Sequence, residues 1–413
     1  MVKKSSRLIK CCQICESKKL ESVIFLGYLP PVNHLYPLGS TVEKESNFPL
    51  ELLRCKDCGL AQINLEISKE ILFPFEYPYL SGTTKVLIDN FLDLSQEVEK
   101  LNLLKQGDLI VDIGSNDGSL LKAFDGKGYK LLGIEPSRAA KVAINDGIPT
   151  LNEYFTDNIV SNVIEKYGKA KIITATNVFA HITQPIKLLN TINRLLDKDG
   201  IFINESHYLS SLIKTLQYDT IYHEHLRYYD LKALKNLLDY KNMKIFHAKK
   251  IKTHGGSIRV YATKSKRINI QTSVKSIFDE ETRTSRTKEF SQFKDKIIDS
   301  KLKLLNIIRL IKQKKQKIYG IGAPSRASTL ICYTGIDDGL IDCVLEVKGS
   351  YKLNKYMPGT RIPILDEKKL FDDQPEYVLL LSWHISDGLI KILKKKGFRG
   401  KFIVPLPSPK IIS

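Results

Sequence analysis

The chain has 413 residues, 43% of them hydrophobic and 26% charged, which is typical of a globular protein with room for two or three domains. Its 64 Lys and Arg against 45 Asp and Glu give a formal net charge of +19, which raises nucleic acid or an anionic membrane surface as a partner. No apolar run approaches the roughly 20 residues that a bilayer-crossing helix needs, and no apolar segment follows the basic start Met1–Lys4. We therefore expect a cytoplasmic protein without a membrane partner.

Two Cys-x-x-Cys pairs stand in the first 60 residues: Cys12 with Cys15, and Cys55 with Cys58. Each pair directs two thiolates at one ion, and two pairs complete the tetrahedral sulfur site that suits zinc. Cys11 competes with Cys12 for the first ligand position, and redox thiols or unpaired core cysteines are the alternative roles. Because four sulfur ligands leave no open coordination position, we expect a structural Zn²⁺ that holds a small lobe and takes no part in catalysis.

A buried strand is predicted over 109–113, and it runs into a turn that contains two glycines, Gly114 and Gly118. Glycines at these points let the backbone approach a ligand closely. The pattern Asp112-x-Gly114-x-Asn116-x-Gly118 resembles the first motif of S-adenosylmethionine-dependent methyltransferases of the Rossmann-like class, with Asn116 where a middle glycine is more frequent. The resemblance implies that this loop holds S-adenosylmethionine.

Strands and helices alternate after this loop. A second apolar strand over 130–134 ends in Glu135, whose carboxylate can accept hydrogen bonds from both hydroxyls of a ribose. Three further elements follow: a strand over 171–175, an amphipathic helix over 185–196 and a strand over 200–203. The alternation predicts an α/β fold in which a parallel sheet has helices on both faces.

The densest group of proton-transfer side chains is Tyr222-His-Glu-His225-Leu-Arg-Tyr-Tyr229. Its two histidines are two residues apart, unlike those of the H-E-x-x-H zinc motif, so the pattern excludes a metalloprotease of that type. A loop or a helix start here would gather Tyr222, Glu224 and His225 around one substrate. A solvent-exposed loop with coincidental histidines is the alternative.

Three other segments carry chemistry-bearing side chains. Asn177 and His181 follow the strand over 171–175, at the carboxyl edge where ligands bind in open α/β sheets. Helix capping or core packing is the alternative role of His181. The segment Tyr77-Pro-Tyr79-Leu-Ser81 offers hydroxyl groups, and the turn His254-Gly-Gly-Ser257 offers an imidazole, although either segment could simply be a linker or a hairpin.

The last third of the chain begins with a strongly basic stretch, because 264–317 contains 16 Lys and Arg but 6 Asp and Glu. Within it, apolar residues recur every seven positions at Phe290, Ile297, Leu304 and Ile311. This spacing predicts an amphipathic helix that packs its apolar stripe on the protein while its lysines stay solvated, which argues against a nucleic-acid groove. Gly320 and Gly322 then suit either a phosphate-approach turn or tight packing in a cofactor-free Rossmann-like domain.

Taken in order along the chain, these motifs resemble those of the sugar C-methyltransferase family. The resemblance extends to the C-terminal third through the segments 319–326, 357–360 and 381–384. The chain departs from the family pattern at Arg326, where lysine is usual, and at His384, where asparagine is commoner.

The resemblance implies three parts: a zinc-binding lobe over 1–75, a Rossmann-like class I methyltransferase domain over 76–265, and a second Rossmann-like domain over 266–413 that helps to hold a nucleotide sugar. It implies methyl transfer from S-adenosylmethionine to carbon 3 of a nucleotide-linked 4-keto deoxysugar through an enolate. The expected carrier is dTDP. Neither nucleic acid nor a protein partner is implied.

In that reaction we expect His225 to act as the general base and Glu224 to orient it, with Tyr222 and His181 near the ketone, donating hydrogen bonds or relaying a proton. Residues assigned to the cofactor are Asp112, Gly114, Asn116, Gly118, Glu135, Asn177, Tyr77 and Ser81. Residues assigned to the substrate are Tyr79, His254 and Arg326.

Two other classes of protein remain open at this point. An RNA methyltransferase would account for the cysteine pairs and the charge, but the segment Asn177-Val-Phe-Ala lacks the Pro-Pro-aromatic pattern that amino-group methylation of nucleic acids often uses. A non-catalytic, zinc-stabilised binding module would not need Glu135 or the cluster from Tyr222 to His225.

Overall fold

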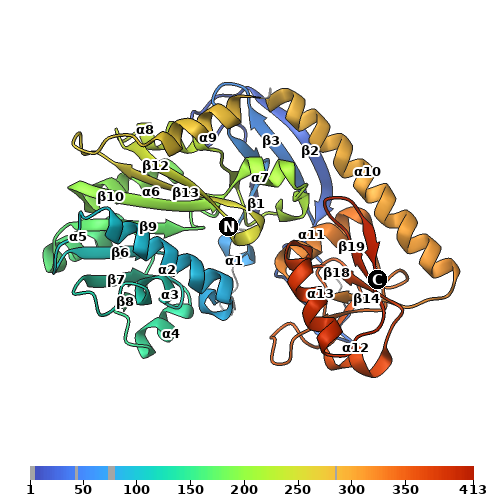
Figure 1. The fold of residues 1–413 in the computed structure, drawn as a ribbon. Helices are drawn as coiled ribbons and strands as arrows, with labels where there is room; N and C mark the ends of the chain where they lie inside the picture. The colour runs from blue at the N-terminus through green and yellow to red at the C-terminus, as the bar shows by residue number, and fades with distance from the viewer. Residues whose placement is uncertain (1–4, 42–44, 73–79, 284–285) are drawn as a thin grey trace.

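The computed structural model describes residues 5–41, 45–72, 80–283 and 286–413. Two α/β units stand beside each other, with the strands of a small N-terminal lobe between them and a long helix joining them (Figure 1). The predicted α/β fold class, with a zinc-binding lobe and two Rossmann-like units, is confirmed.

The first unit contains a seven-stranded sheet with the order β12-β13-β10-β9-β6-β7-β8. Its strands are β6 (Leu109–Ile113), β7 (Lys130–Ile134), β8 (Thr150–Leu151), β9 (Ala170–Thr176), β10 (Leu196–His207), β12 (Lys244–Ile251) and β13 (Ser257–Thr263). The strands β8, β7, β6, β9 and β10 are mutually parallel, whereas β13 runs antiparallel to both of its neighbours. The strands predicted over 109–113 and 130–134 have the observed bounds.

Helices cover both faces of this sheet: α2 (Lys85–Lys100), α3 (Ser119–Lys122), α4 (Ala139–Asn145), α5 (Asp157–Tyr167), α6 (Pro185–Leu195), α7 (Leu209–Lys214), α8 (Leu231–Asp239) and α9 (Thr272–Thr282). Three 3₁₀ turns complete the unit: η1 (Ser81–Thr83), η2 (Tyr218–Thr220) and η3 (Thr253–Gly255). Successive side chains on a strand point to opposite faces, so Ile110 and Val111 of β6 enter different cores. Side-chain oxygens of Thr156 and Asp230 cap the first turns of α5 and α8.

The N-terminal lobe is built from β1 (Ser6–Leu8), β2 (Leu20–Leu29), β3 (Phe48–Cys55), β4 (Ala61–Ile63), β5 (Leu65–Ile67) and α1 (Lys69–Leu72). Its four-stranded sheet, β11-β4-β3-β2, takes one strand from far along the chain. That strand, β11 (Arg227–Tyr228), follows the histidine cluster and pairs Arg227 with Gln62 and Tyr228 with Ala61. The sequence analysis did not predict this pairing.

The second unit also contains a seven-stranded sheet, with the order β16-β17-β15-β14-β18-β19-β20. Its elements are β14 (Ile318–Ile321), α11 (Ser325–Thr334), β15 (Cys343–Glu346), β16 (Lys355–Tyr356), β17 (Pro363–Asp366), α12 (Lys368–Asp373), β18 (Tyr377–Leu380), η4 (Trp383–Ile385), α13 (Ser386–Lys395), β19 (Lys401–Val404) and β20 (Lys410–Ile412). The five inner strands are parallel and the two edge strands are antiparallel, as expected of a Rossmann-like unit.

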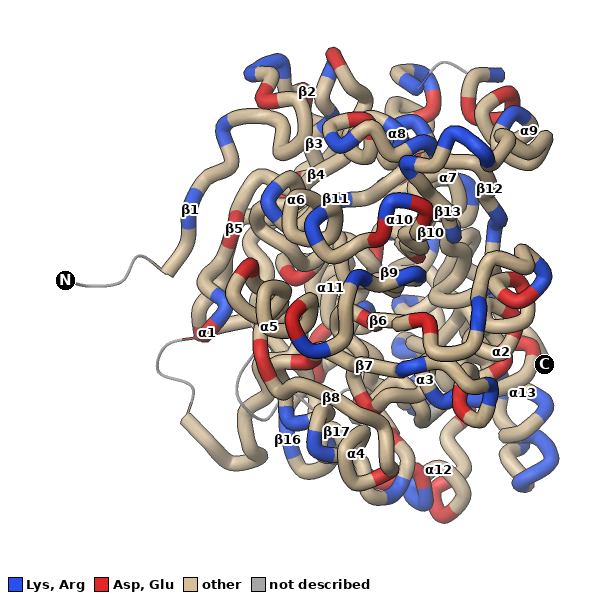
Figure 2. Tube along the Cα trace, turned by 90° about the vertical axis from the view of Figure 1, so that its left-hand side faces the viewer, with Lys and Arg blue, Asp and Glu red and all other residues tan. Residues whose placement is uncertain are grey.

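Helix α10 (Arg286–Gln313) leads into the second unit and is about 42 Å long at 1.5 Å per residue. The four apolar residues at seven-residue spacing are all buried, which confirms the predicted stripe. On the face shown in Figure 2, Lys and Arg positions are interspersed with Asp and Glu positions. Among the described residues, no helix has the length and apolar character that crossing a membrane requires.

Among the described residues, the core that belongs to the lobe alone is a small cluster of Phe48, Leu65, Ile67 and Leu72. Apolar residues around the cysteine pairs, such as Ile14 and Leu60, pack with the first unit. The apolar residues of β2 and β3, such as Leu26 and Leu50, instead share a core with α10 and the second unit. The lobe therefore lies at the junction of the two α/β units (Figure 1).

Candidate active site

The four predicted zinc ligands lie together. The Sγ atoms of Cys12 and Cys58 are 3.4 Å apart, those of Cys15 and Cys55 are 3.5 Å apart, and all four lie within 4.8 Å of one another. This spacing suits four thiolates around one ion with Zn–S bonds of about 2.3 Å. Cys11 is outside the group, which settles the register in favour of Cys12. The donor set fits Zn²⁺.

The predicted cofactor loop joins β6 to α3. Gly114 has φ +69° and Gly118 has φ +75°, and a Cβ at either position would press on a neighbour, at 2.8 Å from Val178 or 3.1 Å from Ala143. Between them, Asn116 also has a positive φ of +51°. Three residues in this left-handed backbone region fold the loop tightly over the carboxyl end of β6, which is the conformation that the two glycines predicted.

Glu135 lies at the end of β7, next to this loop, as predicted. Its carboxylate accepts a hydrogen bond from the backbone N–H of Asn116 at 3.0 Å and another from that of Ser137 at 2.8 Å. Each carboxylate oxygen keeps a second lone pair, so the group is held in one orientation while it can still accept ribose hydroxyls. This hydrogen-bond acceptor fits the ribose hydroxyls of S-adenosylmethionine.

Asp112 lies beneath the loop rather than on its surface, with 2% of its area exposed. Thr174 Oγ1 donates a 2.6 Å hydrogen bond to the carboxylate. Burial raises the pKa of Asp112 to about 7, an effect that the nearby charges of Glu135 and Glu205 reinforce. Its place in cofactor binding stays a prediction.

Two other predicted cofactor residues flank the loop. Ser81 donates its backbone N–H to Asn116 Oδ1 at 2.9 Å, which ties η1 to the loop. Asn177 follows β9 with φ +59°, and its backbone N–H donates to the carbonyl of Glu205 at 2.8 Å. Tyr77 and Tyr79 lie outside the described residues.

The structure brings His225 and Tyr222 together. His225 Nδ1 is 3.2 Å from the carbonyl oxygen of Thr220, and His225 Nε2 is 3.2 Å from the hydroxyl of Tyr222. Because a carbonyl only accepts, these partners assign the proton to Nδ1 and the lone pair to Nε2, which accepts from Tyr222. Burial lowers the pKa of His225 well below its usual value, and the neighbouring His181 adds to this effect. The imidazole is therefore neutral, and its role as the general base stays a prediction.

His181 lies beside His225, with ring centroids 5.0 Å apart. Its Nδ1 is 2.8 Å from the backbone carbonyl of Glu224, so the proton is again on Nδ1 and Nε2 is an acceptor. Burial lowers the pKa of His181 to about 4, and the charge of Arg227 contributes to this shift. In this tautomer Nε2 can accept or relay a proton, whereas donation from Nε2 to a ketone would require a second proton on the ring.

The carboxylate of Glu224 faces the lobe, where Asn33 Nδ2 donates to its Oε1 at 2.8 Å. Asn33 Oδ1 in turn accepts from Ser325 Oγ at 2.9 Å, so one chain of hydrogen bonds joins the two α/β units through the lobe. The ring of His225 takes its orientation from Thr220 and Tyr222. An orienting role for Glu224 toward His225 stays a prediction.

Arg326 makes a buried contact between the two α/β units. Its Nε and Nη2 atoms each donate to a carboxylate oxygen of Asp219 at 2.7 Å, and Trp383 Nε1 donates to the same carboxylate at 2.7 Å. Arg326 also lies near the predicted site residue His254, because its charge adds to burial in lowering the pKa of His254 to about 4. His254 occupies the η3 turn with φ +54°. Substrate binding by Arg326 and His254 stays a prediction.

Sequence reasoning missed Asn33, Asp219 and Thr220. Thr220 acts through its backbone carbonyl, so its side chain carried no signal. Asp219 stands only three residues before Tyr222, and an acidic residue so close to the predicted cluster was the available clue. Asn33 follows Pro30-Pro31-Val32, a pattern that indicates a turn and nothing about its distant partner.

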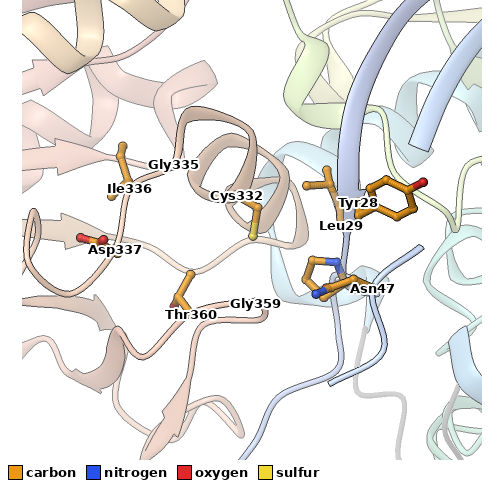
Figure 3. Close-up of a pocket in the computed structure, with 10 residues that line it drawn as sticks. Tyr28, Leu29, Asn47, Cys332, Gly335, Ile336, Asp337, Gly359 and Thr360 are labelled. Carbon is orange, nitrogen blue, oxygen red and sulfur yellow. The ribbon is translucent and has the colours of Figure 1, made fainter. Parts of the chain in front are cut away.

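A cavity of about 320 Å³ opens elsewhere, between the end of β2 and the C-terminal end of α11 (Figure 3). It is lined by Tyr28, Leu29, Pro30, Asn47, Cys332, Gly335, Ile336, Asp337, Gly359 and Thr360. None of the predicted site residues that the structure describes lines it, so it is separate from the site described above.

Three family models match successive parts of the chain. They are described as "Putative zinc binding domain" over residues 12–73, "Methyltransferase domain" over 83–248 and "C-methyltransferase C-terminal domain" over 252–407. Among solved structures, the chain is similar to the plantazolicin methyltransferase BpumL with S-adenosylhomocysteine (14% identity, TM-score 0.36, 44% of this chain and 87% of that one). It is also similar to magnesium protoporphyrin IX methyltransferase from Synechocystis with bound S-adenosylmethionine (16% identity, TM-score 0.32, 43% and 78%).

The strand order, the cofactor loop and the family models together define an S-adenosylmethionine-dependent methyltransferase that carries a zinc-binding lobe. The chain is also 30% identical to C-methyltransferase NovU of Streptomyces niveus over 418 residues, which covers 98% of each protein. It belongs to this family of C-methyltransferases. The acceptor of the methyl group is therefore a carbon atom, and the alternative of an RNA methyltransferase is not favoured.

Proposed function

We propose that the protein methylates carbon 3 of a nucleotide-linked 4-keto deoxysugar, with dTDP as the carrier. The observation that carries the proposal is the pair of neutral imidazoles, His181 and His225, beside the hydroxyl of Tyr222. A carbon atom becomes nucleophilic only after it loses a proton, and a carbon next to a ketone loses one most easily. A neutral base beside a hydroxyl donor suits that step.

In the first step the ketone oxygen of the substrate gives the Tyr222 hydroxyl a second acceptor. Burial and the charge of Glu224 hold the pKa of Tyr222 well above its usual value, so the hydroxyl stays protonated and remains a donor. When this hydroxyl turns from His225 Nε2 to the ketone oxygen, the lone pair of Nε2 becomes available for the proton on carbon 3.

His225 Nε2 then takes that proton. The electrons of the C–H bond form a double bond between carbons 3 and 4, and the carbonyl electron pair moves to the oxygen, which becomes an enolate stabilised by the Tyr222 hydroxyl. S-Adenosylmethionine, when bound, would supply the electrophilic methyl group. The C=C electron pair of the enolate would form the new C–C bond as the ketone re-forms, and the electron pair of the broken C–S bond would stay on sulfur. Gly114, Asn116 and Glu135 would hold the cofactor beside the histidines.

The test is exchange of the carbon 3 proton of dTDP-4-keto-6-deoxyglucose with solvent deuterium, followed by NMR with and without S-adenosylmethionine. Exchange and methyl transfer by the wild-type protein are the expected results. His225→Gln should lose both while binding S-adenosylmethionine normally, and Tyr222→Phe should slow both about 10²-fold. The matched control is His247→Gln, because His247 on β12 bonds Ser273.

If His225→Gln exchanges and methylates at the wild-type rate, the base is another group. If the wild-type protein acts on no member of a panel that adds 3-amino and 2-deoxy nucleotide ketosugars, the proposed substrate class is wrong. The family assignment does not depend on either result.

A further inference from the structure

Arg227 is a buried cation that donates hydrogen bonds to uncharged groups of the described residues. It is 1% exposed, and its guanidinium donates to Tyr229 Oη at 2.9 Å, to Gln13 Oε1 at 2.7 Å and to the carbonyl oxygens of Phe179 (3.0 Å) and Ile182. Within the described part of the chain, no carboxylate forms an ion pair with it. A buried charge is costly unless an opposite charge lies near it, so its counter-charge needs another source.

The four cysteines are the anionic group nearest to Arg227 along its hydrogen bonds. Gln13, which accepts a hydrogen bond from Arg227 Nη1, stands between Cys12 and Cys15, and four thiolates around one Zn²⁺ would carry a net charge of −2. The backbone N–H of Gln13 donates to Gln62 Oε1 at 2.9 Å, and Gln62 pairs with Arg227 between β4 and β11. Arg227 is therefore tied to the first cysteine pair in two ways: its guanidinium bonds Gln13, and its backbone pairs with Gln62.

The opposite side of the guanidinium holds the two histidine segments. The carbonyls of Phe179 and Ile182 bracket His181, and Arg227 itself stands two residues after His225. Two further hydrogen bonds of 2.8 Å join the same segments, from Leu226 N to the carbonyl of Ala180 and between His181 Nδ1 and the carbonyl of Glu224. A displacement of the guanidinium would thus move the His181 segment relative to the His225 segment.

We propose that Arg227 is a positioning residue through which the zinc-thiolate centre fixes the mutual placement of His181 and His225. This inference builds on the proposed roles of the two histidines. It revises the expectation that zinc serves the lobe alone, because the lobe contributes the acceptor that orients Arg227. Removal of a residue that holds catalytic groups in place without touching the substrate typically lowers activity by about 10- to 100-fold.

The test uses two variants and a matched control. Arg227→Lys keeps the positive charge but loses the planar guanidinium whose N–H groups reach Gln13 and the two carbonyls. Gln13→Ala removes the hydrogen-bond acceptor that lies between Cys12 and Cys15. Tyr240→Phe is the control, since Tyr240 Oη donates to the carbonyl of Ile14 at 2.8 Å and so also joins the first cysteine pair to the first α/β unit.

Three properties are measured for each variant: zinc content, steady-state kinetics, and the ¹⁵N imidazole signals of His181 and His225, assigned with His181→Gln and His225→Gln. We expect all three variants to bind one zinc per chain. Arg227→Lys and Gln13→Ala should lower kcat about 10- to 100-fold at unchanged KM for S-adenosylmethionine and should shift both imidazole signals. Tyr240→Phe should leave kcat and the signals as in the wild type.

The proposal is overturned if Gln13→Ala binds zinc and keeps the wild-type imidazole signals, or if Tyr240→Phe shifts those signals as strongly. If Arg227→Lys does not fold, Gln13→Ala decides the question alone, because removal of the Gln13 amide perturbs the fold less than replacement of the buried guanidinium. The NMR measurement needs no sugar substrate, so a wrong substrate class would abolish the kinetic readout and leave the imidazole readout intact.

Discussion

Replacing Asp219 with alanine should loosen the junction between the two α/β units. The carboxylate is fully buried and accepts three hydrogen bonds of 2.7 Å, two from Arg326 and one from Trp383. Arg326 is itself 7% exposed, so the variant leaves a buried guanidinium without its charge partner. Removal of one member of such a pair costs about 3–5 kcal/mol. We expect Asp219→Ala to lose that much of the free energy of unfolding.

Tryptophan fluorescence can follow this junction, because Trp383 is the only tryptophan in the chain and hydrogen-bonds the Asp219 carboxylate directly. Urea unfolding followed by tryptophan fluorescence reports on the junction, and circular dichroism reports on the whole chain. Asp299→Ala is the control: its ion pair with Lys303 lies on the surface of α10, and its loss should cost less than about 1 kcal/mol. An Asp219→Ala variant that unfolds within 0.5 kcal/mol of the wild type, measured by fluorescence, would refute this reasoning.

Two further outcomes follow from the structure. Burial lowers the pKa of His207 to about 3 and that of His223 to about 4. Below about pH 6.5 the unfolded chain therefore takes up protons that the folded chain does not. The free energy of unfolding should fall as the pH drops through this range, by about 2 kcal/mol per histidine at pH 5. Urea unfolding at pH 7 and pH 5 measures this loss, and an equal free energy at both values would contradict it. Cys55→Ser should lose zinc and solubility together, whereas Cys11→Ser should lose neither. Metal analysis of the purified variants checks this. A zinc-free yet stably folded Cys55→Ser protein would show that the metal is not structural.

The sequence was sufficient where a function depends on residues close together in the chain. A Cys-x-x-Cys pair places its own two thiolates, and the turn from Gly114 to Gly118 fixes its own backbone, so both appear in the spacing. The same holds for the three-residue separation that lets Tyr222 meet His225 across one turn.

The contacts that join these local motifs were not predictable. Gln13 and Arg227 are 214 residues apart, Asn33 and Glu224 are 191 apart, and Asp219 and Arg326 are 107 apart. Each is a single polar pair chosen by the packing of whole domains, and no local period or composition encodes it. The sequence therefore predicted the parts of the site but not the hydrogen bonds that hold the parts together.

The pairing of β4 with β11 also determines the order in which the protein can be completed during synthesis. Gln62 leaves the ribosome 165 residues before its partner Arg227, an interval of about 8–33 s at 5–20 residues per second. Until β11 is made, β4 is an unpaired edge strand whose three residues are all buried in the finished protein. The nascent lobe is thus exposed to aggregation for that interval, and zinc binding alone cannot close its sheet.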